Sequence, residues 1–141
     1  MIDDVILNKA ATLERCVARA REEYAKDPEG FCRDFTRQDA AILNIQRACQ
    51  AALDAGHHLI RRERLGIPQG SRNVFELLTR GGWIDPALSL ALQRMVGFRN
   101  IAVHDYQAVH FPILVAIINE HLNDLLDFSQ AIVQHAGLSR P

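Results

Sequence analysis

Apolar side chains recur at intervals of three or four residues along most of this chain, which places them on one face of an α-helix. Over residues 3–24 they form one continuous stripe, and Asp3 or Asp4 can cap the first turn. Residues 27–30 then supply a proline and a glycine, as expected of a turn. The pattern therefore predicts a first helix over residues 3–24, with one buried face.

A second helix is predicted from near Thr36 to Ile60. Thr36 and Asp39 are spaced as in a capping box with Asp in place of Glu. The following stretch is rich in residues that favour helix. Arginines gather at its C-terminal end, where positive charge complements the helix dipole. Gly66 and Pro68 are expected to end it.

Three further helices complete the pattern. A short one begins with Ser71 as its cap and ends at a pair of glycines. Asp85 followed by Pro86 opens a fourth, because a capping side chain before a proline is typical of a helix start. The last begins near His110 or Pro112, runs to residue 136 and ends at Gly137.

Four long helices and one short helix predict an all-α fold, an antiparallel four-helix bundle with one extra short helix. The 141 residues are expected to form a single domain, residues 1–141. The longest apolar run, residues 111–118, is too short to cross a membrane, and residues 1–4 do not resemble a signal peptide. A soluble cytoplasmic protein is expected, with its three cysteines as unpaired thiols: Cys16, Cys32 and Cys49.

Charge is unevenly distributed along the chain. The net charge is −1, but residues 61–99 carry seven arginines, no lysine and three acidic residues. Arginine suits geometric recognition of phosphate better than lysine does. Each of these arginines can equally serve at a helix end, so the basic segment alone does not establish a nucleic-acid interface.

The richest chemistry lies in residues 99–106, where Arg99, His104 and Tyr106 follow one another closely. Arginine offers a fork of donors to phosphate, and histidine exchanges a proton near neutral pH. In a continuous helix Arg99 and His104 would be about 140° apart around the axis. We therefore expect the helix to end, or an irregular turn to form, between them. Each residue also has a purely structural alternative. Arg99 can be a charge at a helix end, His104 a polar residue at the end of the bundle, and Tyr106 an aromatic residue of the core.

The motif R-x4-H-x-Y, opened by Arg99 and Asn100, resembles that of the HepT-type toxins of the HEPN superfamily. Residues 95–98 before it, residues 65–69 and 75–78, and residues 34–39 fit the same family. Asp39, Gln46 and Arg47 also fit its pattern, without an assignable role. The resemblance thus extends through nearly the whole chain.

This resemblance implies a HEPN-like fold and the toxin of a type VII-like toxin–antitoxin pair. The activity it implies is a metal-independent endoribonuclease that cleaves tRNA or mRNA through attack by the 2′-hydroxyl. Arg99 would be the catalytic cation and His104 the proton-transfer group, in a cleft between the subunits of a homodimer. Asn100 would hold the arginine or contact phosphate. Asp105 would orient His104 or cap a helix.

The resemblance also assigns Tyr106 as the site at which an MntA-type nucleotidyltransferase antitoxin attaches AMP. The partner consumes the ATP, so this chain is expected to hold no cofactor. No metal is expected either: Asp54 and His57 are three residues apart, but no matching ligand pair accompanies them.

Two other interpretations remain open from the sequence. The first is a non-catalytic helical adaptor that binds nucleotide and a nucleotidyltransferase. It would need the same motif residues as the nuclease. The second is a purely structural bundle, in which neither Arg99 nor His104 matters to any activity.

Overall fold

The computed structural model describes residues 3–104 and 110–135, with only the backbone of His104. Within these residues the regular structure is helical and contains no strand. The long helices are α1 (Asp4–Ala25), α2 (Phe35–Glu63) and α4 (Pro86–His104), with the short α3 (Ser71–Arg80) between the last two. The final stretch comprises α5 (Phe111–Ala116), the π-helical turn η3 (Ile117–His121) and α6 (Leu122–His135). A 3-10 turn, η1 (Phe31–Arg33), precedes α2.

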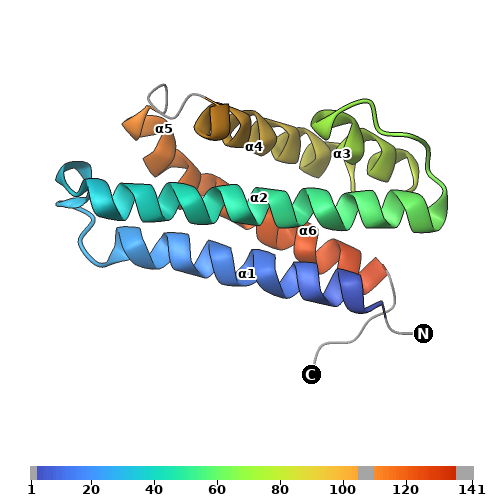
Figure 1. Ribbon diagram of the computed structural model, residues 1–141, viewed down its shortest axis with the longest axis horizontal. Coiled ribbons are helices and arrows are strands. Elements are labelled where there is room, and N and C mark those ends of the chain that lie inside the picture. The colour runs from blue at the N-terminus through green and yellow to red at the C-terminus, as the bar shows by residue number, and fades with distance from the viewer. Residues whose placement is uncertain (1–2, 105–109, 136–141) are drawn as a thin grey trace.

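The helices form an antiparallel bundle (Figure 1). α1 and α2 lie side by side, α4 returns along α2, and the α5–α6 stretch runs back between α1 and α4. α3 packs on α2 and α4 near the C-terminal end of α2. The predicted all-α bundle with one extra short helix is confirmed. No helix in the described ranges is long and apolar enough to cross a membrane.

Side-chain caps define two helix starts that the sequence predicted. The Asp3 carboxylate accepts from the backbone N–H groups of Val5 (3.1 Å) and Ile6 (3.2 Å). Asp85 lies directly before Pro86, and its carboxylate accepts from the N–H of Leu88 at 2.7 Å. Each cap satisfies backbone donors that have no partner within the helix.

Two other predicted caps are wrong. α2 begins after Asp34, whose carboxylate accepts from the N–H of Arg37 at 3.1 Å, so Thr36 is inside the helix. The preceding 3-10 turn brings Asp34 into the capping position. Ser71 is the first residue of α3 and not its cap; the cap is Gly70, which offers no side-chain hydrogen bond.

The C-terminal end of α2 also differs from expectation. The helix stops at Glu63, and Arg64 adopts the left-handed conformation (φ 54°, ψ 50°), two residues before Gly66. Arg62 donates to Asp3 at 2.8 Å and to Glu63 at 2.7 Å, and it lies over the Trp83 ring. Arg62 therefore acts at the C-terminal end of α2, far from Gln50, the residue of α2 that contacts the motif.

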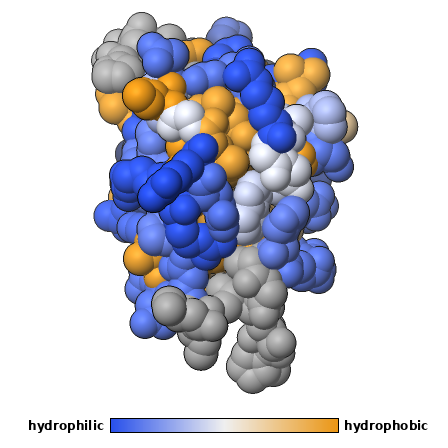
Figure 2. Space-filling view, turned by 90° about the vertical axis from the view of Figure 1, so that its right-hand side faces the viewer, coloured by the Kyte–Doolittle hydropathy of each residue, from blue (hydrophilic) through white to orange (hydrophobic). Residues whose placement is uncertain are grey.

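The end of the bundle that faces the viewer in Figure 2 is mainly hydrophilic around a smaller hydrophobic area.

The core contains aliphatic and aromatic side chains from all the long helices. Phe75 of α3 packs edge-on against Phe128 of α6, with ring centroids 5.7 Å apart. α3 approaches α2 closely because residue 56 is glycine: a Cβ there would lie 2.5 Å from Val74 Cγ1. Cys16 and Cys49 are buried free thiols as expected, whereas Cys32 is exposed.

The last predicted helix is interrupted. It begins at Phe111, but five residues form a π-helical turn before α6 continues to His135. The insertion changes which residues of α6 face the core, and Leu122, Leu125 and Phe128 are buried beyond it. The expected end at Gly137 lies outside the described residues.

Candidate active site

Helix α4 carries the motif and runs unbroken from Pro86 to His104. The expected break between Arg99 and His104 is therefore wrong. The physical reason is that the buried positions Met95, Phe98 and Ala102 continue the helical spacing through this segment. Five residues of helix separate Arg99 from His104 by about 140° around the axis. One subunit does not present the two positions on the same side of α4.

The Arg99 side chain is partly exposed and is held toward α2. One terminal nitrogen donates to Asn100 Oδ1 at 2.7 Å, and the other donates to Gln50 Oε1. Both acceptors are neutral amides, so they orient the guanidinium without cancelling its charge. Of the two roles open to Asn100, contact with Arg99 is the one seen in the structure.

Gln50 connects Arg99 to a second polar group. Its side-chain nitrogen donates to Asp54 Oδ1 at 2.8 Å, one turn further along α2. Asp54 in turn forms an ion pair with Lys9 of α1, with Nζ 3.2 Å from Oδ2. A chain of polar contacts thus runs from α4 across α2 to α1.

Sequence reasoning missed Gln50. Its spacing of four from Asp54 was a signal for a polar stripe on α2. That spacing did not show which neighbouring helix the stripe faces, since Gln50 and Arg99 are 49 residues apart.

The other expected site residues are only partly described. His104 is the last residue of α4. Asp105 and Tyr106 lie outside the described residues. By helical register, His104 lies about 20° from Gly97 and so on the side of α4 away from Gln50.

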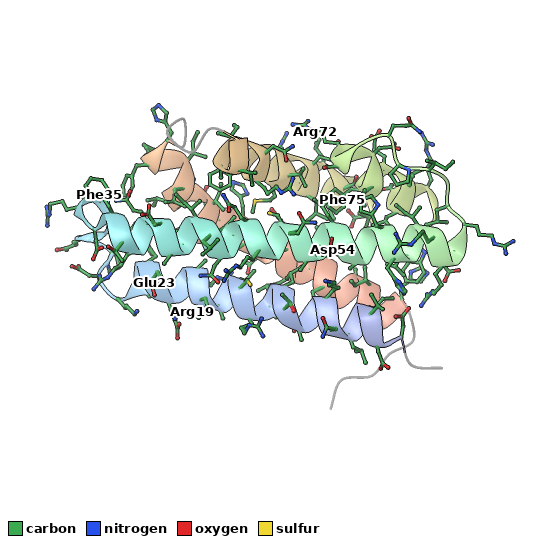
Figure 3. The ribbon with its side chains drawn as sticks, viewed as in Figure 1. Arg19, Glu23, Phe35, Asp54, Arg72 and Phe75 are labelled. Carbon is green, nitrogen blue, oxygen red and sulfur yellow. The ribbon has the colours of Figure 1, made fainter. Side chains whose placement is uncertain are left out.

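That second side of α4 borders a cavity of about 290 Å³ between α3, α4 and α5. Arg72, Arg94, Gly97, Ile101 and Ile113 are among its lining residues. Figure 3 shows Arg72 beside α4. The cavity combines two guanidinium groups with exposed aliphatic side chains, and a Cβ at residue 97 would lie 3.1 Å from an Arg72 nitrogen.

Cys49, the residue before Gln50 on α2, is a buried thiol. Burial raises the pKa of Cys49 to about 12, although the positive charge of Arg99 acts in the opposite direction. The thiol is therefore neutral at physiological pH, and its Sγ lies 3.9 Å from the Met95 carbonyl oxygen. Cys49 contributes packing and offers no thiolate nucleophile at this site.

The Asp54 and His58 side chains of α2 both have partners outside the motif. Asp54 binds Gln50 and Lys9, and His58 lies 2.7 Å from Asp3. The described part of the chain contains no group of three or more His, Cys, Asp or Glu residues that could hold a metal ion.

The family described as Ribonuclease HepT-like matches residues 13–132. The chain belongs to this family. The mRNA nuclease HepT of Shewanella oneidensis is 46% identical over 131 residues, which cover 93% of this chain and 98% of that protein. The family and the ribonuclease class that the sequence implied are therefore confirmed.

Solved structures of relatives agree. A toxin–antitoxin complex with AMP-PNP matches with a TM-score of 0.89 at 45% identity, covering 94% of this chain and 99% of that one. A tri-AMPylated Shewanella oneidensis HEPN toxin in complex with an MNT antitoxin matches with the same score, identity and coverage. The toxin assignment that the sequence implied is therefore confirmed as well. The cytosolic protein YutE of Bacillus subtilis shares the fold, with a TM-score of 0.70 at 16% identity. That match covers 89% of this chain and 88% of YutE.

Proposed function

We propose that this HepT-like protein acts as a metal-independent endoribonuclease toxin in which Arg99 and His104 are catalytic. The observation that carries the proposal is the Arg99 guanidinium, fixed by Gln50 and Asn100 with its charge uncompensated by either. Such a group suits the stabilisation of a phosphorane, whose negative charge grows during the reaction.

The proposed reaction needs only the substrate and proton transfer. The 2′-oxygen bonds to phosphorus while the bond to the 5′-oxygen breaks. The products are a 2′,3′-cyclic phosphate and a 5′-hydroxyl end. A base must take the proton of the 2′-hydroxyl, and an acid must give one to the leaving 5′-oxygen. One His104 cannot do both at once, so two copies of the chain supply the two roles.

A homodimer through α4 would meet this need. Ile101 and Val103 on α4 and Ile113 on α5 are about half exposed, at 48%, 51% and 53%. Val103 is close in register to Arg99, and Ile101 is close to His104. Burying these side chains against a symmetric copy removes apolar surface from water and brings both motifs to one cleft.

The proposed regulator is an MntA-type nucleotidyltransferase antitoxin that transfers AMP from ATP to Tyr106. Two solved relatives are toxin–antitoxin complexes, and the toxin in one of them is tri-AMPylated. Tyr106 follows the end of α4 by two residues. A phosphate attached there would repel RNA phosphate near Arg99. A Tyr106→Phe variant should retain cleavage and escape the antitoxin, with no AMP mass gain after incubation with antitoxin and ATP.

Cleavage assays with labelled RNA in the presence of EDTA test the nuclease directly. Arg99→Ala and His104→Ala should each lower the rate by at least 100-fold, the usual scale for losing a charge-stabilising or proton-transfer group. Arg80→Ala is the matched control, because Arg80 is an exposed arginine on α3. RNA cleavage that persists in both motif variants would refute the assignment. Antitoxin binding without any cleavage by the wild type would favour the adaptor instead.

A further inference from the structure

A groove of about 490 Å³ lies between α1 and α2, outside the residues of the motif. Four of its ten lining residues are basic: Lys9, Arg15, Arg19 and Arg47. Asp54 is the one carboxylate among the lining residues. Figure 3 shows Arg19 on α1 and Asp54 on α2, the two helices that border the groove. A chain with a net charge of −1 thus concentrates positive charge here.

Two of these cations are already paired. Lys9 binds Asp54, and Arg19 binds Glu22 and Glu23 of its own helix. Arg15 and Arg47 are both exposed, and neither has an ion pair within the described ranges. They extend from different helices into one groove.

Both free guanidinium groups act on the same buried thiol. Burial raises the pKa of Cys16, and the charges of Arg15 and Arg47 oppose that rise. Arg15, Arg47 and Cys16 all line this groove, so the two guanidinium groups border the same hollow. Because the one carboxylate that lines the groove is paired with Lys9, these two guanidinium groups can bind an anion such as phosphate.

The groove is continuous with the candidate active site through Gln50. Gln50 lines the groove and also accepts the hydrogen bond from Arg99. Arg47 is three residues before Gln50, so the two side chains are neighbours on the surface of α2. A phosphate on Arg47 and a phosphate on Arg99 can therefore belong to one strand.

We propose that the α1–α2 groove binds backbone phosphates of the RNA next to the cleaved bond, with Arg15 and Arg47 as the paired contacts. The inference rests on the proposed function, because Arg99 marks the cleaved phosphate. It gives Arg47 the role that sequence alone could not assign. Neither arginine contacts the reacting atoms, so both set substrate affinity and leave the chemical step unchanged.

Binding of a 2′-O-methyl RNA oligonucleotide tests the groove without requiring cleavage, since the blocked 2′-oxygen cannot attack. Arg15→Ala and Arg47→Ala should each raise the Kd about fivefold to tenfold. Each should also reduce the slope of log Kd against log salt by about 0.7, the value expected for one lost phosphate contact with a single strand. Arg80→Ala on α3 should change neither quantity, and Arg47→Lys should retain most of the salt slope.

Further measurements separate the outcomes. A dinucleotide substrate has a single phosphate, so its cleavage rate should be the same in Arg47→Ala and wild type. The proposal would be overturned if Kd and salt slope were unchanged in both groove variants. It would also be overturned if the wild type bound ATP and Arg47→Ala abolished that binding without weakening RNA binding. Failure of the proposed function has a different signature, namely cleavage that survives Arg99→Ala. Thermal melts of the variants confirm folding, because both side chains are exposed.

Discussion

Gln50 on α2 accepts a hydrogen bond from the Arg99 guanidinium on α4. This contact fixes the side of α4 from which the arginine acts, and it places the amide between the motif and the groove bordered by α1. Gln50 is a positioning residue, because it acts on phosphate through Arg99.

Gln50→Ala should lower kcat/KM for RNA about tenfold, since a hydrogen bond to a charged group contributes on the order of 1.5 kcal/mol. The comparison is made from initial cleavage rates at several RNA concentrations. Gln46→Ala, one turn earlier on the same helix, is the control because it has no hydrogen bond to Arg99 among the described side chains.

The replacement Gln50→Glu distinguishes orientation from charge. It retains an acceptor at the same place but puts a carboxylate against Arg99, which would compete with phosphate. We expect it to be less active than Gln50→Ala and to recover activity as salt rises. Equal activity in wild type and both variants would show that Gln50 does not position Arg99.

The caps at Asp3 and Asp85 could be predicted from sequence because each depends on a few neighbouring residues. The start of α2 could not, because it depends on the preceding 3-10 turn. Near Arg99 the spacing of Met95, Phe98 and Ala102 fits a continuous helix, and all three side chains are buried. A break in the helix is not needed to bring an arginine and a histidine to one cleft if a second subunit supplies one of them.

The site was predictable only in part for a similar reason. Arg99 and Asn100 are adjacent, so their contact follows from the motif. The contact of Arg99 with Gln50, and the groove that Arg15 and Arg47 both line, each involve two different helices. Such relationships depend on how the helices pack, which periodicity does not specify.

Gly56→Ala should destabilise the fold by about 1–3 kcal/mol, because overpacking a filled interior forces its neighbours to move. The added Cβ would lie 2.5 Å from Val74 Cγ1 and 3.3 Å from Leu78 Cδ1. Urea unfolding measures the change. Combining it with Val74→Ala should recover part of the loss, because the smaller side chain makes room between α2 and α3. Strictly additive losses in the double variant would contradict this account of the contact.

Asp3→Asn should weaken the fold at neutral pH and have progressively less effect in acid. Burial raises the pKa of Asp3, but hydrogen bonds from His58, the Ile6 N–H and Arg62 together leave it below the usual 3.8. A lowered carboxyl pKa contributes stability above the unfolded value and loses it as pH falls through the folded value. Unfolding free energies measured from pH 7 to about pH 2 should therefore stay apart until the pH nears the usual 3.8 and converge below it. A constant difference across that range would rule out the carboxylate as the cause.

Ile101→Asp should separate the proposed dimer and abolish most cleavage while leaving Arg99 and His104 in place. A carboxylate at this half-exposed position would have to lose its water between two subunits, and that cost can exceed what pairing with Arg72 or Arg94 of the same cavity returns. Sedimentation should show a monomer, and RNA cleavage should fall on the order of 100-fold because one chain lacks either the acid or the base. Ile67→Asp is the matched control, since Ile67 is 81% exposed in the α2–α3 connection. A fully active Ile101→Asp monomer would show that a single subunit completes the site, and the two-copy mechanism would then be wrong.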